Sequence, residues 1–192
     1  MGDISSILWY NAYMKKTIAF FGHRHILDTK IRERIKNEIE INLCDDIQCL
    51  IGVHGEFDRL ALSVCRELRE SYPQIKIIVV LTSLNIFKKS TSNASSIMEI
   101  YRDVETMIYD IEDEHFKKHI VVSNRKMVDD CDLVICYVDM KKSKSGAKRA
   151  INYAKKKGKK IINLFRDEDR AFYGMSEQEI EAEWNKFINK KN

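Results

Sequence analysis

The stretch TIAFFGHR, residues 17–24, joins a run of apolar residues to a glycine and two basic side chains. The run from Thr17 to Phe21 has no apolar–polar alternation, which is typical of a strand buried on both faces of a sheet. Gly22 ends the run, and a glycine allows the backbone to turn tightly there. The sequence therefore predicts that the first strand of a parallel sheet ends in this loop.

Apolar strand-like runs alternate with helical stripes along the rest of the chain. Residues spaced by three or four positions mark one face of a helix. The predicted strands are 17–21, 47–51, 75–81, 107–109, 133–138 and 160–164, and the predicted helical stripes are Ile31–Leu43, Phe57–Leu68 and Ala147–Ala154, with a further helix ending around Asp130. This alternation predicts an α/β fold with a mostly parallel sheet of about six strands and helices on both faces.

The two ends of the chain carry predicted additions to this fold. Residues 1–14 are interpreted as an N-terminal extension, because Met14 looks like a natural translation start just before the first strand. Residues 15–192 are expected to form a single domain, since no linker-like run interrupts them. Ser176 and Glu179 fit a capping box at the start of a terminal helix.

Composition and charge exclude several classes of protein. Hydrophobic residues make up 44% and charged residues 32% of the chain, which is ordinary for a soluble globular protein. The sequence has no apolar run long enough for a membrane span and no secretory signal, so a cytoplasmic protein without a membrane partner is expected. The net charge of +4 is too small to indicate a nucleic-acid partner by itself. The lysines between Lys155 and Lys160 favour a helix end at Gly158, with a nucleic-acid patch as the alternative.

The cysteines form an odd set without a C-x-x-C pair: Cys44, Cys49, Cys65, Cys131 and Cys136. Their apolar surroundings indicate reduced thiols in or near the core. A zinc site made of Cys44, Cys49 and a distant histidine is the alternative, but the spacing differs from that of a zinc knuckle. We therefore expect no metal site, and we also expect no cofactor.

The first candidate for ligand binding is the loop Gly22-His23-Arg24. In a parallel sheet, ligands bind beyond the carboxyl ends of the strands, near a switch point in the strand order. Exposed backbone amides together with a guanidinium can hold a phosphate group there. A solvated Arg24 without a ligand is the alternative interpretation.

The second candidate is the loop from Gly52 to Asp58. Its glycines Gly52 and Gly55 permit a close approach of the backbone to a ligand. Asp58 either caps the following helix or accepts hydrogen bonds from a ribose or a base. His54 is either a loop residue or a ligand contact, and its closeness to Glu56 does not make a catalytic pair.

Three further segments complete the predicted crevice. Ser145 and Gly146 open a helix and offer free amides to an anion. Arg125 points toward a rim of the sheet, with a surface ion pair to Asp129 as the alternative. Thr82 begins a polar loop, 82–96, that is expected to move as a lid. The candidate ligand-binding residues are Gly22, His23, Arg24, Gly52, His54, Gly55, Glu56, Asp58, Thr82, Arg125, Ser145 and Gly146.

In combination, these motifs resemble the SLOG superfamily of Rossmann-like domains, which is named for the Smf/DNA-processing proteins and the Lonely guy enzymes. The chain is most similar to small bacterial members whose first strand ends in TGHR. The matching segments are Phe21–Arg24, Gly52–Ala61, Ser123–Asp129 with Asp132, and Ser145–Ala147 with Tyr153, Ala154 and 156–162. The resemblance covers residues 15–165 and implies a three-layer sandwich that binds a nucleotide. Ser123, Ser145 and Glu56 depart from the family pattern, so the ligand is expected to differ from that of relatives.

The resemblance leaves three functions open. The first is binding, by sensing or sequestering, of a nucleotide or nucleotide-derived ligand in bacterial stress or phage-defence signalling, as a homo-oligomer. The second is nucleotide N-glycoside hydrolysis as in Lonely guy enzymes, with Glu56, Asp58 and Arg125 as the catalytic candidates. Arg125 and Lys126 match the Arg-Lys pair of those enzymes, but Ala150 stands where their motif has a glutamate. The third is DNA binding of the DNA-processing type.

Overall fold

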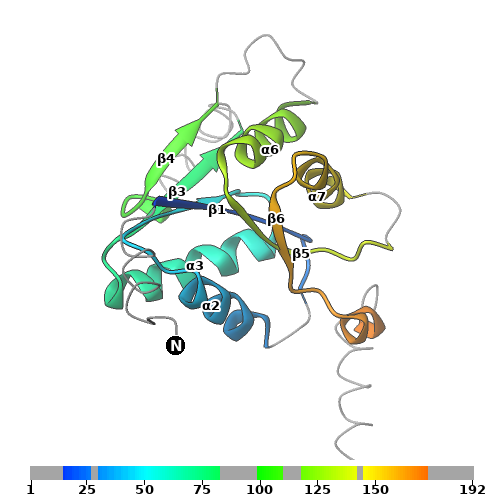
Figure 1. Cartoon of the computed structure of the whole chain (residues 1–192), viewed down its shortest axis with the longest axis horizontal. Coiled ribbons are helices and arrows are strands. Elements are labelled where there is room, and N and C mark those ends of the chain that lie inside the picture. Colours follow the sequence, from blue (N-terminus) through cyan, green and yellow to red (C-terminus); the bar gives the residue numbers. More distant parts are fainter. Residues whose placement is uncertain (1–14, 27–29, 83–98, 110–117, 142–144, 173–192) are drawn as a thin grey trace, which may run out of the picture.

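A parallel sheet forms the centre of the computed structural model, which describes residues 15–26, 30–82, 99–109, 118–141 and 145–172 (Figure 1). The sheet has six strands in the order β4-β3-β2-β1-β5-β6, and every neighbouring pair is parallel. The strands are β1 (Lys15–Gly22), β2 (Asp46–Ile51), β3 (Ile75–Leu81), β4 (Glu105–Ile108), β5 (Leu133–Tyr137) and β6 (Lys160–Asn163). The predicted α/β fold class is thus confirmed.

Helices cover both faces of the sheet and complete three layers (Figure 1). On one face lie α2 (Ile31–Ile41) and α3 (Glu56–Ser71), and on the other lie α6 (His119–Asp130) and α7 (Gly146–Lys156). A short 3₁₀ helix, η2 (Asp167–Phe172), follows β6. Among the described residues, no helix has the length and apolar character needed to cross a membrane.

The apolar run of β1 is explained by its central place in the sheet. Ile18 and Phe20 pack in the core beneath α2 and α3, whereas Ala19 and Phe21 pack beneath α6 and α7. All four side chains are buried. Because both faces of β1 contact helices, neither face requires polar residues.

The strand order places a switch point beside β1. The chain builds β2, β3 and β4 on one side of β1 and then returns to add β5 and β6 on the other side. β1 pairs with β2 through Phe20 and Ile51 and with β5 through Gly22 and Tyr137. The segments that follow β1, β2 and β5 therefore leave the same edge of the sheet.

The lysine-rich run after α7 closes the helix. Gly158 has a left-handed φ of 67°, and the amide of Lys159 donates to the carbonyl oxygen of Ala154 at 3.0 Å. The Lys159 ammonium donates to the carbonyl oxygens of Asp129 and Cys131 at the end of α6. These contacts confirm that the helix ends at this run.

Other predictions are met to different degrees. Leu43 does not continue the α2 stripe, because the helix ends at Ile41 and the amides of Asn42 and Leu43 bond back to its last carbonyl groups.

All five cysteines are free and buried. The described part of the chain contains no group of three or more His, Cys, Asp or Glu residues suited to a metal ion. Residues 1–14, most of the polar loop 82–96 and the predicted terminal helix lie outside the described residues.

Candidate functional site

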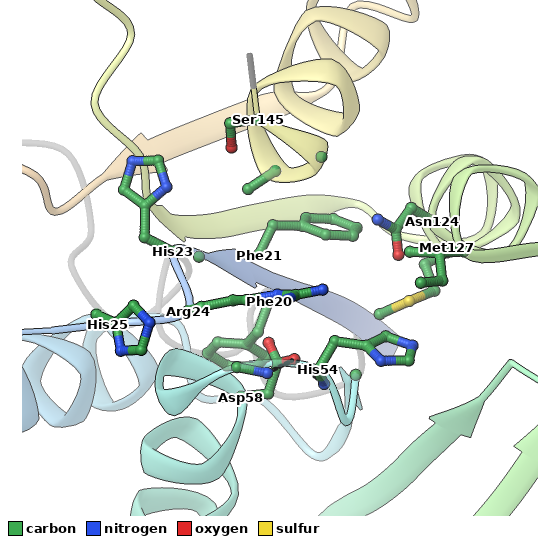
Figure 2. A pocket seen from close by; sticks show the side chains of 16 residues that line it. Phe20, Phe21, His23, Arg24, His25, His54, Asp58, Asn124, Met127 and Ser145 are labelled. Carbon is green, nitrogen blue, oxygen red and sulfur yellow. Dashed lines mark hydrogen bonds between the residues drawn. The ribbon is translucent and has the colours of Figure 1, made fainter. Parts of the chain in front are cut away.

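A cavity of about 400 Å³ opens at the carboxyl edge of the sheet, beside the switch point (Figure 2). Its walls come from the end of β1, the loop after β2, the start of α3, one face of α6 and the start of α7. The lining residues are Phe20, Phe21, Gly22, His23, Arg24, His25, Gly52, His54, Gly55, Asp58, Ile120, Asn124, Met127, Ser145, Gly146 and Ala147. This volume lies within the range of small-molecule sites in proteins.

Gly22 allows α3 to approach the end of β1. A Cβ atom at this position would lie 2.2 Å from Cγ and 2.3 Å from Cβ of Phe57. The Phe57 side chain is fully buried and stacks on Tyr137 with a centroid distance of 6.3 Å. A side chain at Gly22 would therefore push apart the two elements that form the floor of the cavity.

His23 has a structural position although its ring borders the cavity. Its side chain is only 4% exposed, and its Nε2 accepts a hydrogen bond of 2.7 Å from the backbone amide of Asp139. Its own amide donates to the carbonyl oxygen of Tyr137 at 3.1 Å. Because Nε2 is an acceptor, the neutral ring carries its proton on Nδ1. His23 thus joins the loop after β1 to the loop after β5.

Arg24 supplies a cation to the cavity. Its side chain is exposed and extends into the cavity in Figure 2. Within the described residues, its guanidinium makes no hydrogen bond or ion pair. Its carbonyl oxygen accepts a bond of 3.0 Å from the Glu56 amide, which fixes the loop against α3. The backbone of Arg24 is therefore fixed, whereas its guanidinium has no partner among the described residues.

Asp58 caps α3 and also faces the cavity. Its Oδ2 accepts hydrogen bonds from the amides of His54, at 2.8 Å, and Gly55, at 3.1 Å. Burial raises the pKa of Asp58 to about 6, although the two hydrogen bonds favour the charged form. No hydrogen bond from a described residue reaches its Oδ1. The cap interpretation is correct for Oδ2, and the same side chain lines the cavity.

His54 connects the loop after β2 to Thr82. Its Nε2 lies 3.3 Å from the Thr82 hydroxyl. Burial, together with the positive charge of Arg24, lowers the pKa of His54 below its ordinary value of 6.5. The imidazole is therefore neutral at pH 7. Thr82 is buried and contacts this histidine rather than lining the cavity itself.

The starts of α3 and α7 differ in the use of their backbone amides. At α3, Gly55 donates to Asp58 and Glu56 donates to the Arg24 carbonyl group. At α7, Ser145 caps the helix by accepting a 3.3 Å bond from the Lys148 amide, while Gly146 and Ala147 line the cavity. A helix start carries partial positive charge on its amides. The start of α7 is thus better suited to an anion than the start of α3.

The structure corrects the placement predicted for Glu56. Its Oε2 accepts a 2.7 Å bond from the Ile26 amide, and its Oε1 lies 3.7 Å from Nδ1 of His25. As the first residue of α3, Glu56 points to a neighbouring hollow rather than into the cavity. Its carboxylate thus joins the loop after β1 to the start of α3.

Arg125 also lies outside the cavity, in a groove between α6 and α7 that adjoins it. Its Cζ atom lies 5.5 Å from the ring centroid of Tyr153. Asp129, the predicted ion-pair partner of Arg125, instead accepts a 3.0 Å bond from the Tyr153 hydroxyl and pairs with Lys157 at 3.1 Å. Arg125 therefore lines the groove that adjoins the cavity and not the cavity itself.

The cavity contains residues of α6 that were not among the candidates. Ile120, Asn124 and Met127 line it, and their spacing of four and three residues places them on one helix face. That spacing is a readable signal, but the apolar periodicity alone assigns the face to packing. Ala147 was missed as well, although it adjoins the candidate Gly146.

The fold is similar to that of a solved bacterial protein. The X-ray structure of DNA processing protein A (DprA) from Streptococcus pneumoniae matches with a TM-score of 0.54 and 17% sequence identity. The match covers 77% of this chain and 49% of that chain, so the chain spans about half the length of DprA. No protein-family model and no curated protein matches the sequence. The likeness to DprA shows that the chain has a Rossmann-like fold of the kind found in that protein.

Proposed function

We propose that the cavity binds a nucleotide or a nucleotide-derived ligand. The observation that carries this proposal is the Arg24 guanidinium, which has no hydrogen bond or ion pair among the described residues and shares a cavity with the start of α7. A guanidinium and free helix amides together are a suitable site for a phosphate group. The anionic end of the ligand is therefore assigned to Arg24, Gly146 and Ala147.

The remaining polar groups suit the sugar and base of such a ligand. The Asp58 carboxylate accepts hydrogen bonds from hydroxyl groups, and the Asn124 amide both donates and accepts. Apolar surface for a base comes mainly from Ile120, while the buried side chains of Phe21 and Met127 border the cavity. The resemblance to the SLOG superfamily points to the same ligand class, and with it to a sensing or sequestering role in a bacterial homo-oligomer.

A ligand screen by thermal unfolding tests this proposal. The screen uses nucleotides, cyclic dinucleotides and ADP-ribose derivatives. A ligand at about 100 times its dissociation constant stabilises a protein by roughly 2.7 kcal/mol, which corresponds to roughly 5–10 °C in Tm for a chain of this size. The absence of any shift across the panel would contradict the proposal.

The variants Arg24→Ala and Arg102→Ala locate the site. Arg102 is exposed and, among the described residues, pairs with Glu99 on the surface, so it is the matched control. Loss of the Arg24 guanidinium is expected to weaken a nucleotide about tenfold or more and to leave the matching nucleoside almost unchanged. Equal losses in the two variants would show that general charge, and not this site, determines binding.

One observation favours hydrolysis as a second candidate function. The Asp58 carboxyl group borders the cavity, and its raised pKa of about 6 suits proton transfer near neutral pH. Release of free base from a bound nucleotide, abolished in Asp58→Asn, would establish this activity. Binding without release would leave the chain as a binding protein. A steep loss of affinity with salt would instead indicate DNA binding.

A further inference from the structure

A basic groove continues from the cavity along the outer side of α6 and α7. It has a volume of about 370 Å³ and shares two lining residues, Asn124 and Gly146, with the cavity. Its cations are Arg125 from α6 and Arg149 and Lys156 from α7. Among the described residues that line the groove, none is acidic. An anion that occupies the cavity can therefore extend into the groove without meeting a carboxylate.

The groove is organised by contacts within the helix pair. The Arg125 guanidinium packs over the Tyr153 ring, and the Tyr153 hydroxyl donates to Asp129 at 3.0 Å. A cation over an aromatic ring is held by the negative face of the ring. Arg149 and Lys156 are exposed and make no ion pair with any described residue. One cation is thus oriented, and two are available to a ligand.

The far end of the groove limits the length of that ligand. Asp129 does not line the groove, but it accepts a hydrogen bond from Tyr153, which does, and it lies at the carboxyl-terminal end of α6. Its neighbouring cations are engaged, since Lys157 pairs with its side chain and Lys159 binds its carbonyl oxygen. The carboxylate and the negative end of the helix dipole disfavour a further phosphate group at this point.

We propose that the groove is a second phosphate-binding site for the ligand of the cavity, and that this ligand is a dinucleotide. One nucleotide unit lies in the cavity, and the phosphate group of the next unit lies among Arg125, Arg149 and Lys156. The inference rests on the proposed function of the cavity. The two adjoining hollows have volumes of about 400 and 370 Å³.

Calorimetry with a double variant tests the groove separately from the cavity. The variant Arg149→Gln/Lys156→Gln removes two exposed cations of the groove. The control, Lys15→Gln/Lys160→Gln, removes two exposed cations from the first residues of β1 and β6, at the opposite edge of the sheet. The probes are nucleoside 5′-monophosphates, linear 5′-phosphorylated dinucleotides, cyclic dinucleotides and a random single strand of about eight nucleotides.

The parent is expected to bind a linear or cyclic dinucleotide more tightly than any monophosphate. In the groove variant, the affinity for the dinucleotide should fall about tenfold, while the affinity for monophosphates stays within about twofold of that of the parent. The control variant should bind both probes like the parent. The form that binds more tightly shows whether the ligand is a linear or a cyclic dinucleotide.

Four outcomes would overturn the inference. Equal affinity for monophosphates and dinucleotides, with no effect of the groove variant, would show that the groove is not a phosphate-binding site and leave the proposed function intact. A loss in the control variant as large as in the groove variant would show an effect of net charge alone. A strand that binds more tightly than every dinucleotide would assign the groove to nucleic acid. A parent that binds no probe would remove both the inference and the proposed function.

Discussion

Replacing Gly22 with alanine places a methyl group inside the contact between β1 and α3. The new carbon atom would lie 2.2 Å from Cγ and 2.3 Å from Cβ of Phe57, whereas ordinary contacts begin at 3.4 Å. Rotation of the Phe57 side chain cannot relieve the clash, because its Cβ is fixed to the backbone of α3. The helix or the end of β1 must therefore move by roughly 1 Å.

The cost of this movement follows from the packing around Phe57, which is fully buried against Tyr137. Overpacking of a core typically costs about 1–3 kcal/mol, and a clash with backbone-fixed atoms belongs at the upper end. We expect Gly22→Ala to lower the free energy of unfolding by about 3 kcal/mol. For a chain of this size, Tm should fall by roughly 6–12 °C.

Gly146→Ala is the matched control for this substitution. It makes the same chemical change on the other side of the cavity, but a Cβ at Gly146 has no atom within 4 Å. Alanine also favours a helix more than glycine does, so its stability should equal or slightly exceed that of the parent. Urea unfolding of both variants gives the comparison. A difference between them below about 0.5 kcal/mol would refute the reasoning, since surface substitutions already vary by this amount.

Three other perturbations test the site without a ligand. Arg24→Ala should raise the pKa of His54, because the Arg24 charge adds to burial in lowering it; an unchanged histidine titration by NMR would place the two groups too far apart to interact. The pKa of Asp58 is about 6 in the folded protein and 3.8 ordinarily, so the folded state binds the proton more tightly. The parent should therefore lose stability relative to Asp58→Asn as the pH rises from 3.8 to about 6. If the free energies of unfolding in urea of the two proteins changed in parallel across this window, the shift would be contradicted. Ser145→Ala should cost about 1 kcal/mol through loss of the helix cap that accepts from the Lys148 amide, and equal unfolding midpoints in urea would show that the cap contributes nothing.

The fold was predictable because each element has a pattern of its own. The run from Ile75 to Leu81 is apolar except for Lys76, begins two residues after Pro73 and becomes β3 with the same limits. Buried isoleucines at every fourth position define α2 in the same way. Leu43 fits the same period but lies beyond the helix. The prediction of the helix end was wrong because periodicity, without a capping signal, does not reveal where a helix ends.

The site residues in the loops that follow strands were predictable from the sequence. The site residues on the faces of helices were less predictable. Arg24, Asp58 and Gly146 follow strands or begin helices at one edge, and they line one cavity. Glu56 is two positions from Asp58, yet on a helix residues two apart point in different directions, so only one of them faces the cavity. Asn124 and Arg125 are adjacent in sequence, but only Asn124 lines the cavity as well as the groove. These separations depend on the rotation of a helix about its axis, which tertiary packing determines.

The burial of every cysteine makes the thiols of this chain reporters of local opening. Cys44, Cys49 and Cys65 lie in the core beneath α2 and α3, whereas Cys131 and Cys136 lie beneath α6 and α7. Burial raises the pKa of Cys131 to about 11 and that of Cys136 to about 12, so neither forms a reactive thiolate in the closed structure. An alkylating reagent consequently reaches the fully buried thiols, Cys49, Cys65, Cys131 and Cys136, when the covering helices separate from the sheet. The modification rates of the two sets, followed by mass spectrometry, measure how often each layer opens, without any engineered probe.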